Sequence, residues 1–597
     1  MQSWGDWLEQ RVDYRIVGRH LANRVLPDGP SWAFTSASCL FWMLVIECVT
    51  GLLLMATYSP SLSSAWASVH FIDQDSAGRF LRGVHHYAAH AMIILFGIHV
   101  VRVLLTGAYR APRELVWITG LLLFPLVIVW TVTGNPLSAS QKGIAQIQVE
   151  GTILAGTPLI GSFLQRLLFG GDDVGILTLT RLYFLHVGLL PLLVGALTVV
   201  HLHQVMKHSP YLLPEAGGAP TSGAALTYWP HQSLRNMITL SVVMGIVGWL
   251  AWRYGAPLYA PADPELVHSP RPEWYFRWLF ELRRHFSGNT EFIATLVIPS
   301  AFLLGFMAVP FLDRFGSHWG STVCRVLVVA ACVGGWGWLT ALSYLQDWND
   351  QGYLAHEAEF AALSERALAL AKTEPITEQG AVMLLRNDPQ TQGPRLFARY
   401  CVSCHSHVDS QGQGLIAAEP TAPNLHGVGT AGWIAGFLDP QRVNSERYFG
   451  QTEFRDGDMV QHIEGLFADA GEEGADELVN ILHAVAAALA AEAAIETPDS
   501  ALVSTGREAI TSKVGCTDCH RFHEQGETGS APDLTGYGSV DWLKQMVARP
   551  TGERFYSDRN DRMPEFAADD AHPELNLMSP LEIDLLIRWL RTPAPGP

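Results

Sequence analysis

The strongest constraint on how this 597-residue chain can fold is the distribution of its apolar residues. A helix that crosses a lipid bilayer needs about 20 consecutive, mainly apolar residues. The first 345 residues contain seven such runs and the rest of the chain contains none. The runs cover residues 33–57, 84–106, 115–134, 180–202, 236–254, 292–312 and 322–345. We therefore expect an all-α fold, with a bundle of seven membrane helices followed by a soluble tail.

The distribution of charge divides the chain at the same place. Residues 346–597 contain 18 basic and 39 acidic side chains, a net charge of −21, whereas the first 345 residues carry +3. A net charge of −18 for the whole chain argues against a nucleic-acid-binding protein, because phosphate neutralisation requires clustered Lys and Arg. The acidity therefore belongs to the tail.

Basic loops predict the orientation in the membrane. Residues 1–30 are rich in arginine and lack the apolar segment of a signal peptide. Since basic loops favour the cytoplasmic side, an odd number of spans places the N-terminus in the cytoplasm and the tail outside. We expect a multi-pass protein of a bacterial inner membrane with a periplasmic tail. The basic residues that carry this argument are Arg11, Arg15, Arg19, Arg24, Arg102, Arg110, Arg113, Lys207 and Arg235.

Half of the eight cysteines form two C-x-x-C-H motifs in the tail. In this signature two thiols bond a c-type haem and the histidine ligates its iron. A redox or zinc-binding pair is the alternative, but two copies 115 residues apart favour two covalent c haems. The motifs are Cys401-Val-Ser-Cys404-His405 and Cys516-Thr-Asp-Cys519-His520. The other four cysteines, Cys39, Cys48, Cys324 and Cys332, fall in predicted spans and are expected to behave as small apolar residues.

Each c haem needs a sixth iron ligand, which is commonly methionine. Met563, followed by proline, is the choice for the second motif. Met459 is the choice for the first, with His462 or an open iron position as alternatives. Met546 and Met578 are expected to be core residues.

Four histidines in two spans form a matched pattern. His85 and His99 are 14 residues apart, and His186 and His201 are 15 apart. At 100° and 1.5 Å per residue, the members of each pair lie near one helical face and ~21–22 Å apart along the axis. Imidazole is a standard haem ligand, so two such helices can hold two stacked haems. His85 and His186 should ligate the outer haem, and His99 and His201 the inner one.

Small residues accompany the predicted haems. Gly120 and Gly134 in the third span are again 14 residues apart, and Gly51 lies in the first span, 14 residues after Ala37. A bulky ring beside a helix requires such positions. Arg82, one turn before His85, can pair with a haem propionate. His86, His90 and His203 are interpreted as packing residues.

These features resemble the cytochrome b of Rieske/cytochrome b quinol oxidoreductases, the bc and bf complexes. The histidine spacing and the stretch from Arg102 to Gly120 are similar to the bf-type protein, and spans five to seven resemble its subunit four, fused here. Pro272-Glu273-Trp274-Tyr275 matches the PEWY signature of the quinol-oxidising site. The resemblance covers about residues 5–345, and the tail resembles two tandem class I cytochromes c.

The resemblance implies five regions. They are a di-haem four-helix bundle (1–210), three helices with PEWY (211–346), a linker (347–384) and two cytochrome c domains (385–495 and 496–597). Proteins of the bf type attach an extra haem through a cysteine in the first span. Thr35 stands at that position here, so the extra haem is not expected.

The resemblance also implies a function, that of a proton-translocating quinol:cytochrome c oxidoreductase of an electron-transport chain. Glu273 accepts a proton from quinol and Tyr275 orients the ring. One electron passes to a separate Rieske iron–sulfur protein, since this chain has no Rieske motif, and then to the c haems. The other crosses the two b haems to an inner quinone site, for which Lys207 and His208 are candidates. A homodimeric complex and a soluble or membrane cytochrome c acceptor are expected.

Two other functions stay open at this point. One is a conduit of b and c haems that passes electrons between quinone and another membrane enzyme without bifurcation. The other is a haem-based sensor or adhesion anchor. The PEWY signature favours the quinol oxidoreductase over both.

Overall fold

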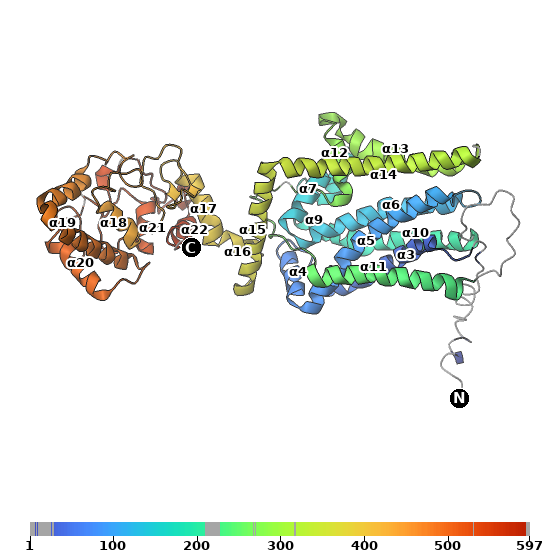
Figure 1. The fold of residues 1–597 in the computed structure, drawn as a ribbon, viewed down its shortest axis with the longest axis horizontal. Coiled ribbons are helices and arrows are strands. Elements are labelled where there is room, and N and C mark those ends of the chain that lie inside the picture. Colours follow the sequence, from blue (N-terminus) through green and yellow to red (C-terminus); the bar gives the residue numbers. More distant parts are fainter. Residues whose placement is uncertain are drawn as a thin grey trace. The chain divides into compact units, whose positions relative to one another are not determined.

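The chain forms two units, Met1–Met383 and Leu384–Pro597, each described here by itself. In Figure 1 the first runs from blue to yellow-green and the second from yellow to red. The computed structural model describes residues 6, 7, 9, 26, 29–208, 227–266, 268, 270–315, 318–528, 531–560 and 562–592. The predicted cytoplasmic arginines Arg11, Arg15, Arg19 and Arg24 lie outside these residues.

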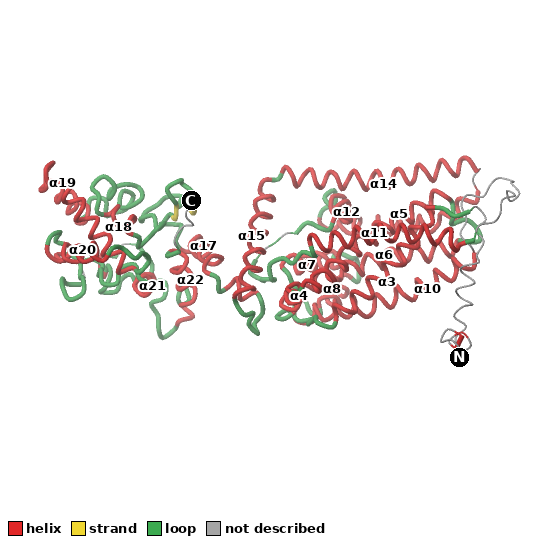
Figure 2. Tube along the Cα trace, turned by 60° about the horizontal axis from the view of Figure 1, so that its bottom comes forward, coloured by secondary structure: helices red, strands yellow, loops and turns green. Residues whose placement is uncertain are grey.

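Helices make up nearly all of the regular structure (Figure 2), which confirms the predicted all-α class. Seven segments of the first unit are long and apolar enough to cross a membrane, and they coincide with the seven predicted runs. The chain is therefore an integral membrane protein. The seven segments are built from η1 (Trp32–Phe34) with α3 (Thr35–Met55), α5 (Ser76–Thr106), α6 (Glu114–Gly134) with η2 (Asn135–Ser138), α9 (Ile176–Tyr183) with η3 (Phe184–Leu189) and α10 (Leu190–His208), η4 (Tyr228–Gln232) with α11 (Ser233–Tyr254), η7 (Ile293–Val297) with α13 (Ile298–Leu312), and α14 (His318–Asn349).

An eighth helix of sufficient length and apolarity, α19 (Asp458–Ala493), was not predicted to span. It lies in the second unit and is broken at Gly471, whose backbone is left-handed. Its residues 484–490 are buried against the neighbouring helices of that unit. A segment whose apolar face is covered by its own unit has the packing of a core helix.

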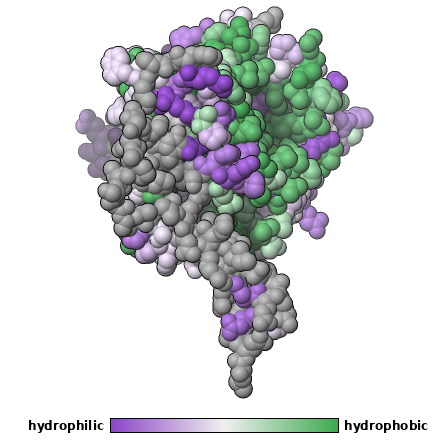
Figure 3. Space-filling view, turned by 90° about the vertical axis from the view of Figure 1, so that its right-hand side faces the viewer, coloured by the Kyte–Doolittle hydropathy of each residue, from purple (hydrophilic) through white to green (hydrophobic). Residues whose placement is uncertain are grey.

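The outer surface of the first unit is apolar. Large side chains of the spans, among them Leu52, Ile98, Leu192 and Trp252, are more than half exposed. Figure 3 shows apolar side chains covering a broad part of one face. Exposed apolar area of this extent is expected where helices contact lipid tails.

The core of the bundle lies between the first four spans. Helix α3 packs on α5, α11 packs on both, and α10 packs on α6. Met43, Met92, Val127 and Val194 are buried together at the centre. Local signals fix the ends of α5, because the Asp75 carboxylate accepts the backbone N–H groups of Ala77 and Gly78 and Gly107 ends the helix with a left-handed backbone.

Short helices follow the spans on the side where α5 begins. The loop after η2 leads into α7 (Gln141–Ala155) and α8 (Gly161–Phe169), and the PEWY segment leads into α12 (Arg277–Arg283). Most of the predicted linker 347–384 is helical. The remaining elements of this unit are α4 (Ala65–Gln74), η5 (Trp274–Phe276), η6 (Gly288–Thr290), η8 (Asp313–Phe315), α15 (Gln351–Thr373) and α16 (Val382–Arg386), which crosses the boundary to the second unit.

The second unit contains both predicted cytochrome c domains around one continuous hydrophobic core. Its two short strands, β1 (His407–Val408) and β2 (Gly414–Leu415), are antiparallel, with His407 opposite Leu415. Besides α19, its elements are α17 (Pro389–Tyr400), α18 (Ala431–Phe437), α20 (Ser500–Ser512), η9 (Cys516–Asp518), α21 (Val540–Ala548), η10 (Ser557–Arg559), η11 (Pro573–Leu575) and α22 (Pro580–Leu590).

Candidate functional site

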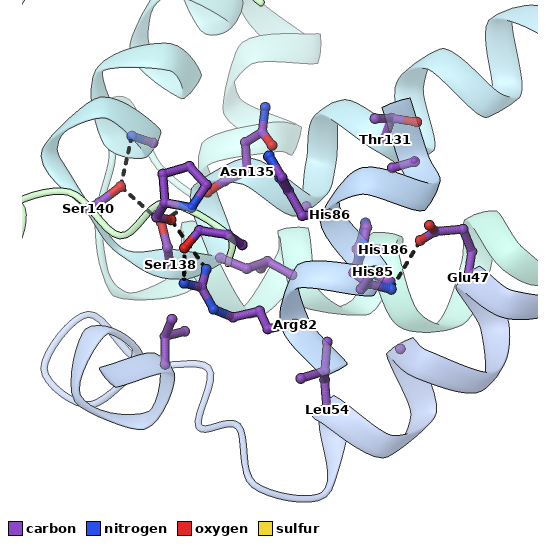
Figure 4. Close-up of a pocket in the computed structure, with 18 of the residues that line it drawn as sticks. Glu47, Leu54, Arg82, His85, His86, Thr131, Asn135, Ser138, Ser140 and His186 are labelled. Carbon is purple, nitrogen blue, oxygen red and sulfur yellow. Dashed lines mark hydrogen bonds and ion pairs between the residues drawn. The ribbon is translucent and has the colours of Figure 1, made fainter. Parts of the chain in front are cut away.

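Two of the four predicted haem-ligating histidines face each other between the second and fourth spans. The rings of His85 on α5 and His186 on η3 have centroids 6.2 Å apart and planes inclined by 82°. They lie side by side in Figure 4. This separation leaves space for one metal ion between the rings. His99 and His201, on α5 and α10, are also near enough to interact electrostatically.

The three predicted glycines lie directly against these histidine rings. A Cβ atom built on Gly134 would be 2.7 Å from Cε1 of His186, and one built on Gly120 would be 3.0 Å from Cε1 of His201. At Gly51 the corresponding distance to Cε1 of His85 is 3.4 Å. The glycines therefore leave the space that the rings and a flat group bound by them require.

A threonine precedes each of these glycines, and its hydroxyl lies at the Nδ1 atom of the same histidine. Thr50 Oγ1 is 2.8 Å from His85 Nδ1, and the distances for Thr133 to His186 and Thr119 to His201 are both 3.2 Å. A hydrogen bond at Nδ1 fixes the ring and leaves Nε2 for the iron. The residues therefore fit two b-type haems. The repeated Thr-Gly dipeptide is a sequence signal that the analysis of spacing missed.

His99 departs from this pattern. The residue before Ala37, which occupies the fourth small-residue position, is Ser36. Both Ser36 Oγ and His99 Nδ1 are buried without a hydrogen-bond partner among the residues that the structure describes. The inner pair is thus less fully hydrogen-bonded than the outer pair.

The outer pair has an additional partner that sequence reasoning missed. The Glu47 carboxylate, with 5% of its side chain exposed, lies 3.0 Å from Nδ1 of His85 (Figure 4). Its second oxygen, Oε1, is buried with no hydrogen-bond partner within the described part of the chain. On the other side, the Trp130 carbonyl is 2.9 Å from Nδ1 of His186. Both outer rings are therefore oriented by at least two groups.

One cavity of about 360 Å³ connects the outer histidine pair with the PEWY segment. At one end it is lined by His85 and His186, and at the other by Glu273 and Tyr275. The cavity therefore brings together residues that the sequence separates by almost 200 positions. The predicted ligands Gly51 and Gly134 and the predicted Arg82 also line it.

The PEWY residues are held by partners from three other elements. Glu273 Oε1 forms an ion pair with Lys142 Nζ at 3.3 Å, and Lys142 also reaches the hydroxyl of Tyr259. Trp274 Nε1 donates to His90 Nδ1 on α5 at 3.1 Å. Burial, opposed by the charge of Glu273 and the contact with Tyr259, leaves the pKa of Lys142 raised, so its ammonium stays charged.

Tyr275 is buried and stays protonated. Burial, together with the nearby carboxylates of Glu273 and Glu150, raises the pKa of its phenol. Glu150 itself accepts a hydrogen bond of 2.7 Å from Gln146 on the same helix, and burial raises its pKa to about 7. Neither Lys142 nor Glu150 was predicted, because no spacing rule links α7 to the PEWY segment.

Arg82 is engaged by protein groups. Its guanidinium pairs with the Asp73 carboxylate and donates to the backbone carbonyls of Ala256 and Pro257. Its pairing with a haem propionate stays a prediction. Lys207 and His208, the candidates for the inner site, lie at the end of α10, and the carbonyl of His208 accepts from Arg113 Nε at 3.2 Å.

The two C-x-x-C-H motifs have the same local geometry. Nδ1 of His405 lies 2.7 Å from the carbonyl of Pro423, and Nδ1 of His520 lies 2.7 Å from that of Pro532. Burial lowers the pKa of both histidines, so both rings are neutral. Each ring is thus oriented with Nε2 able to bind iron.

The thiols and methionines near the two motifs also fit a covalently attached haem. All four cysteines, Cys401, Cys404, Cys516 and Cys519, are free thiols. Met459 and Met563 are partly buried against the core of the same unit. The donor set of each motif is therefore that of a c-type haem.

A membrane bundle whose facing histidines are lined by Thr-Gly pairs defines a b-type membrane cytochrome. The family model described as cytochrome b(N-terminal)/b6/petB matches residues 90–262. Cytochrome b6 of Synechococcus elongatus is 30% identical over 203 residues, which cover 34% of this chain and 94% of that protein. The menaquinol:cytochrome c reductase cytochrome b subunit of Bacillus subtilis is 34% identical over 211 residues, covering 34% and 94%.

The chain belongs to the cytochrome b family, on the b6 side of it. A solved structure entitled "Hyperthermophilic respiratory Complex III" shares the fold, with a TM-score of 0.51 and 22% identity. The match covers 60% of this chain and 95% of that one.

Proposed function

We propose that this chain is the electron-transfer subunit of a proton-translocating quinol:cytochrome c oxidoreductase. The observation that carries the proposal is the single cavity shared by Glu273, Tyr275, His85 and His186. A quinol in this cavity would contact a proton acceptor and the outer haem-binding pair at once. The names of the Bacillus subtilis relative and of the structural neighbour agree with this class of reaction.

The b haems, when bound, each take up and release one electron. His85 and His186 would hold the outer haem, and His99 and His201 the inner one. The hydroxyls of Thr50, Thr133 and Thr119 orient three of these rings, and Gly51, Gly134 and Gly120 keep the adjacent space open. Electrons can then pass from the outer to the inner side of the bundle.

Quinol oxidation releases two protons, and the cavity region offers two carboxylates for them. The Lys142 ammonium favours the ionised form of Glu273, which is the form able to accept a proton. Tyr275 is protonated and can donate a hydrogen bond to a quinol oxygen. Glu150, with a pKa of about 7, is poised to accept the second proton near neutral pH.

The second unit would deliver electrons onward. Cys401 and Cys404, and Cys516 and Cys519, would attach the two c haems, and His405 and His520 would ligate their irons. The tail would be periplasmic, where c haems are attached, and the membrane would be a bacterial inner membrane. We propose a homodimeric complex with a separate Rieske protein. Its acceptor would be a basic soluble or membrane cytochrome c, steered by the tail charge of −21.

The test is Glu273→Gln in the purified complex, assayed with a quinol and an oxidised cytochrome c. We expect turnover to fall about 100-fold, the range that one general base contributes, with both b haems retained in the optical spectrum. Glu374→Gln, which changes an exposed glutamate elsewhere in the first unit, is the matched control. Unchanged turnover would remove Glu273 from the mechanism. A complex that lacks an iron–sulfur signal in electron paramagnetic resonance would favour the non-bifurcating conduit instead.

A further inference from the structure

The second unit is built from an internal repeat. Each copy consists of a helix, a C-x-x-C-H motif, a proline that accepts the hydrogen bond of the motif histidine, a Gly-x-Gly turn, a short helix containing tryptophan, a methionine and a final helix. In the first copy these are α17, the motif at 401–405, Pro423, Gly427, Gly429, α18, Met459 and α19. In the second they are α20, the motif at 516–520, Pro532, Gly536, Gly538, α21, Met563 and α22.

The first helix of copy one packs on the last helix of copy two. On α17, Gly393 lies so near Trp589 of α22 that an added Cβ would be 2.2 Å from the Cβ of Trp589. The rings of Phe397 and Trp589 have centroids 5.7 Å apart. Gln390 at the start of α17 donates to the hydroxyl of Thr592, just after α22, at 2.9 Å. These contacts hold the two ends of the unit together.

The reciprocal pair is formed by the other two helices. On α20, Gly506 approaches α19 so closely that a Cβ would lie 1.9 Å from the carbonyl oxygen of Ala484. Arg507 and Glu492 form an ion pair of 2.8 Å across the same contact. The unit therefore contains two helix pairs, and each pair combines one helix from each copy.

The methionine segments follow their final helices into these mixed pairs. His462, one turn after Met459, has Nε2 at 2.9 Å from the carbonyl of Val514, two residues before Cys516. Phe566, three residues after Met563, has its ring 6.1 Å from that of Tyr400, which directly precedes Cys401. Each methionine segment therefore lies beside the haem motif of the other copy.

The two copies meet at their Gly-x-Gly turns. All four glycines have positive φ angles between 67° and 84°. A Cβ on Gly538 would lie 3.3 Å from the Cα of Gly429. A left-handed backbone and this close approach both require glycine. These turns are where the second half of each copy leaves its first half.

We propose that the two c-haem sites are assembled from exchanged halves. The iron held by His405 takes Met563 as its sixth ligand, and the iron held by His520 takes Met459. This crosses the pairing that sequence order suggests, in which each motif uses the methionine that follows it. His462 is then engaged by Val514 rather than by iron. The inference rests on the proposed c haems, and absence of covalent haem at both motifs would end that proposal separately.

The test uses full-length protein with one c haem. Cys401→Ala with Cys404→Ala leaves only the haem of the second motif, and Cys516→Ala with Cys519→Ala leaves only the first. In each background Met459→Leu and Met563→Leu are compared through the methionine-to-iron charge-transfer band and the midpoint potential of the c haem. Leucine preserves volume but cannot bind iron. Met546→Leu on α21 is the control and should change neither readout.

Crossed assembly predicts that the haem of the second motif loses the band in Met459→Leu and keeps it in Met563→Leu. The haem of the first motif should show the reverse, and each loss should lower the potential. The opposite pattern, or a band retained in both variants, would overturn the proposal.

A second measurement does not depend on ligand variants. A protease site inserted between Thr497 and Pro498 allows the intact folded chain to be cut between the two copies. Exchanged halves predict that both fragments stay associated under native conditions and that both c haems keep their methionine bands. Release of a C-terminal fragment with a methionine-ligated haem would overturn the proposal.

Discussion

The outer and inner histidine pairs occupy equivalent positions on the same helices, yet their surroundings differ. His85 and His186 are bonded by two threonines, a backbone carbonyl and a carboxylate, and they border a cavity. His201 is bonded by Thr119, whereas His99 Nδ1 has no partner among the described atoms. The helical repeat supplies the ligands at both levels, and the neighbouring side chains make the two levels chemically different.

The difference suggests a direction for electron flow. A carboxylate beside a ligating histidine increases the electron density that the ring gives to the metal and favours its oxidised state. Glu47 does this only at the outer position. The outer haem is therefore expected to have the lower midpoint potential, which favours transfer from the quinol cavity toward the inner haem.

The largest expected effect removes the outer level altogether. Gly134→Val places carbon atoms within 2.7 Å of the His186 ring, so we expect the outer b haem to be lost and the inner one to remain. The haem-to-protein ratio in a pyridine haemochrome assay should fall by one b haem. Gly195→Val, at a position on α10 with open space around it, should leave both. Retention of two b haems in Gly134→Val would contradict the assignment.

The next variant equalises the two levels. Glu47→Gln removes the carboxylate and keeps a hydrogen-bonding group of the same size. We expect the outer midpoint potential to rise by about 60 mV, which is tenfold in a one-electron equilibrium, with the inner potential unchanged. A redox titration monitored in the b-type bands measures both. Equal shifts at both haems would show that Glu47 acts on the bundle in general.

A third variant tests whether proton acceptance belongs only to the outer level. Because burial raises the pKa of Glu150 to about 7, the folded protein favours its neutral form below this pH and loses that preference as pH rises through 7. Only ionised Glu150 accepts a proton, so quinol oxidation should accelerate across pH 7. Glu150→Gln should remove this rise while leaving the midpoint potential of the inner haem unchanged. A wild-type pH profile in the variant would exclude Glu150.

The smallest expected effect compares the hydroxyls. Thr50→Ala deletes a hydrogen bond to His85, worth about 1 kcal/mol, and should lower outer-haem affinity severalfold in a reconstitution titration. Ser36→Ala deletes a hydroxyl with no partner in the described structure and should change inner-haem affinity less. An effect of Ser36→Ala as large as that of Thr50→Ala would show that Ser36 bonds His99 once haem is present.

The sequence was sufficient for features that follow a helical period. The spacing of His85, His99, His186 and His201 and of the glycines led directly to the facing rings. The partners of these rings could not be found in this way. Glu47 and Thr50 act through a neighbouring helix, and the relevant contact between α3 and α5 exists only after packing. The Thr-Gly dipeptide was visible in the sequence, but its meaning requires the structure.

The quinol cavity shows the same limit from another side. PEWY identified Glu273 and Tyr275, while Lys142 and Glu150 come from a helix more than 100 residues earlier, where no motif announces them. Arg82 was identified from its distance to His85, yet Asp73 engages its guanidinium. In the tail, the two repeats look alike in sequence whether their halves pair within a copy or between copies.

The exchange of halves has a consequence for biogenesis. The ligands of the first c haem would be separated by about 150 residues of chain, and contacts of such high sequence separation form late in folding. The first haem would therefore be attached to a site that stays incomplete until the last helix has been synthesised. A chain that stops before α22 would carry haem but could not mature either centre alone, so maturation of the two c haems would be a single, all-or-none event.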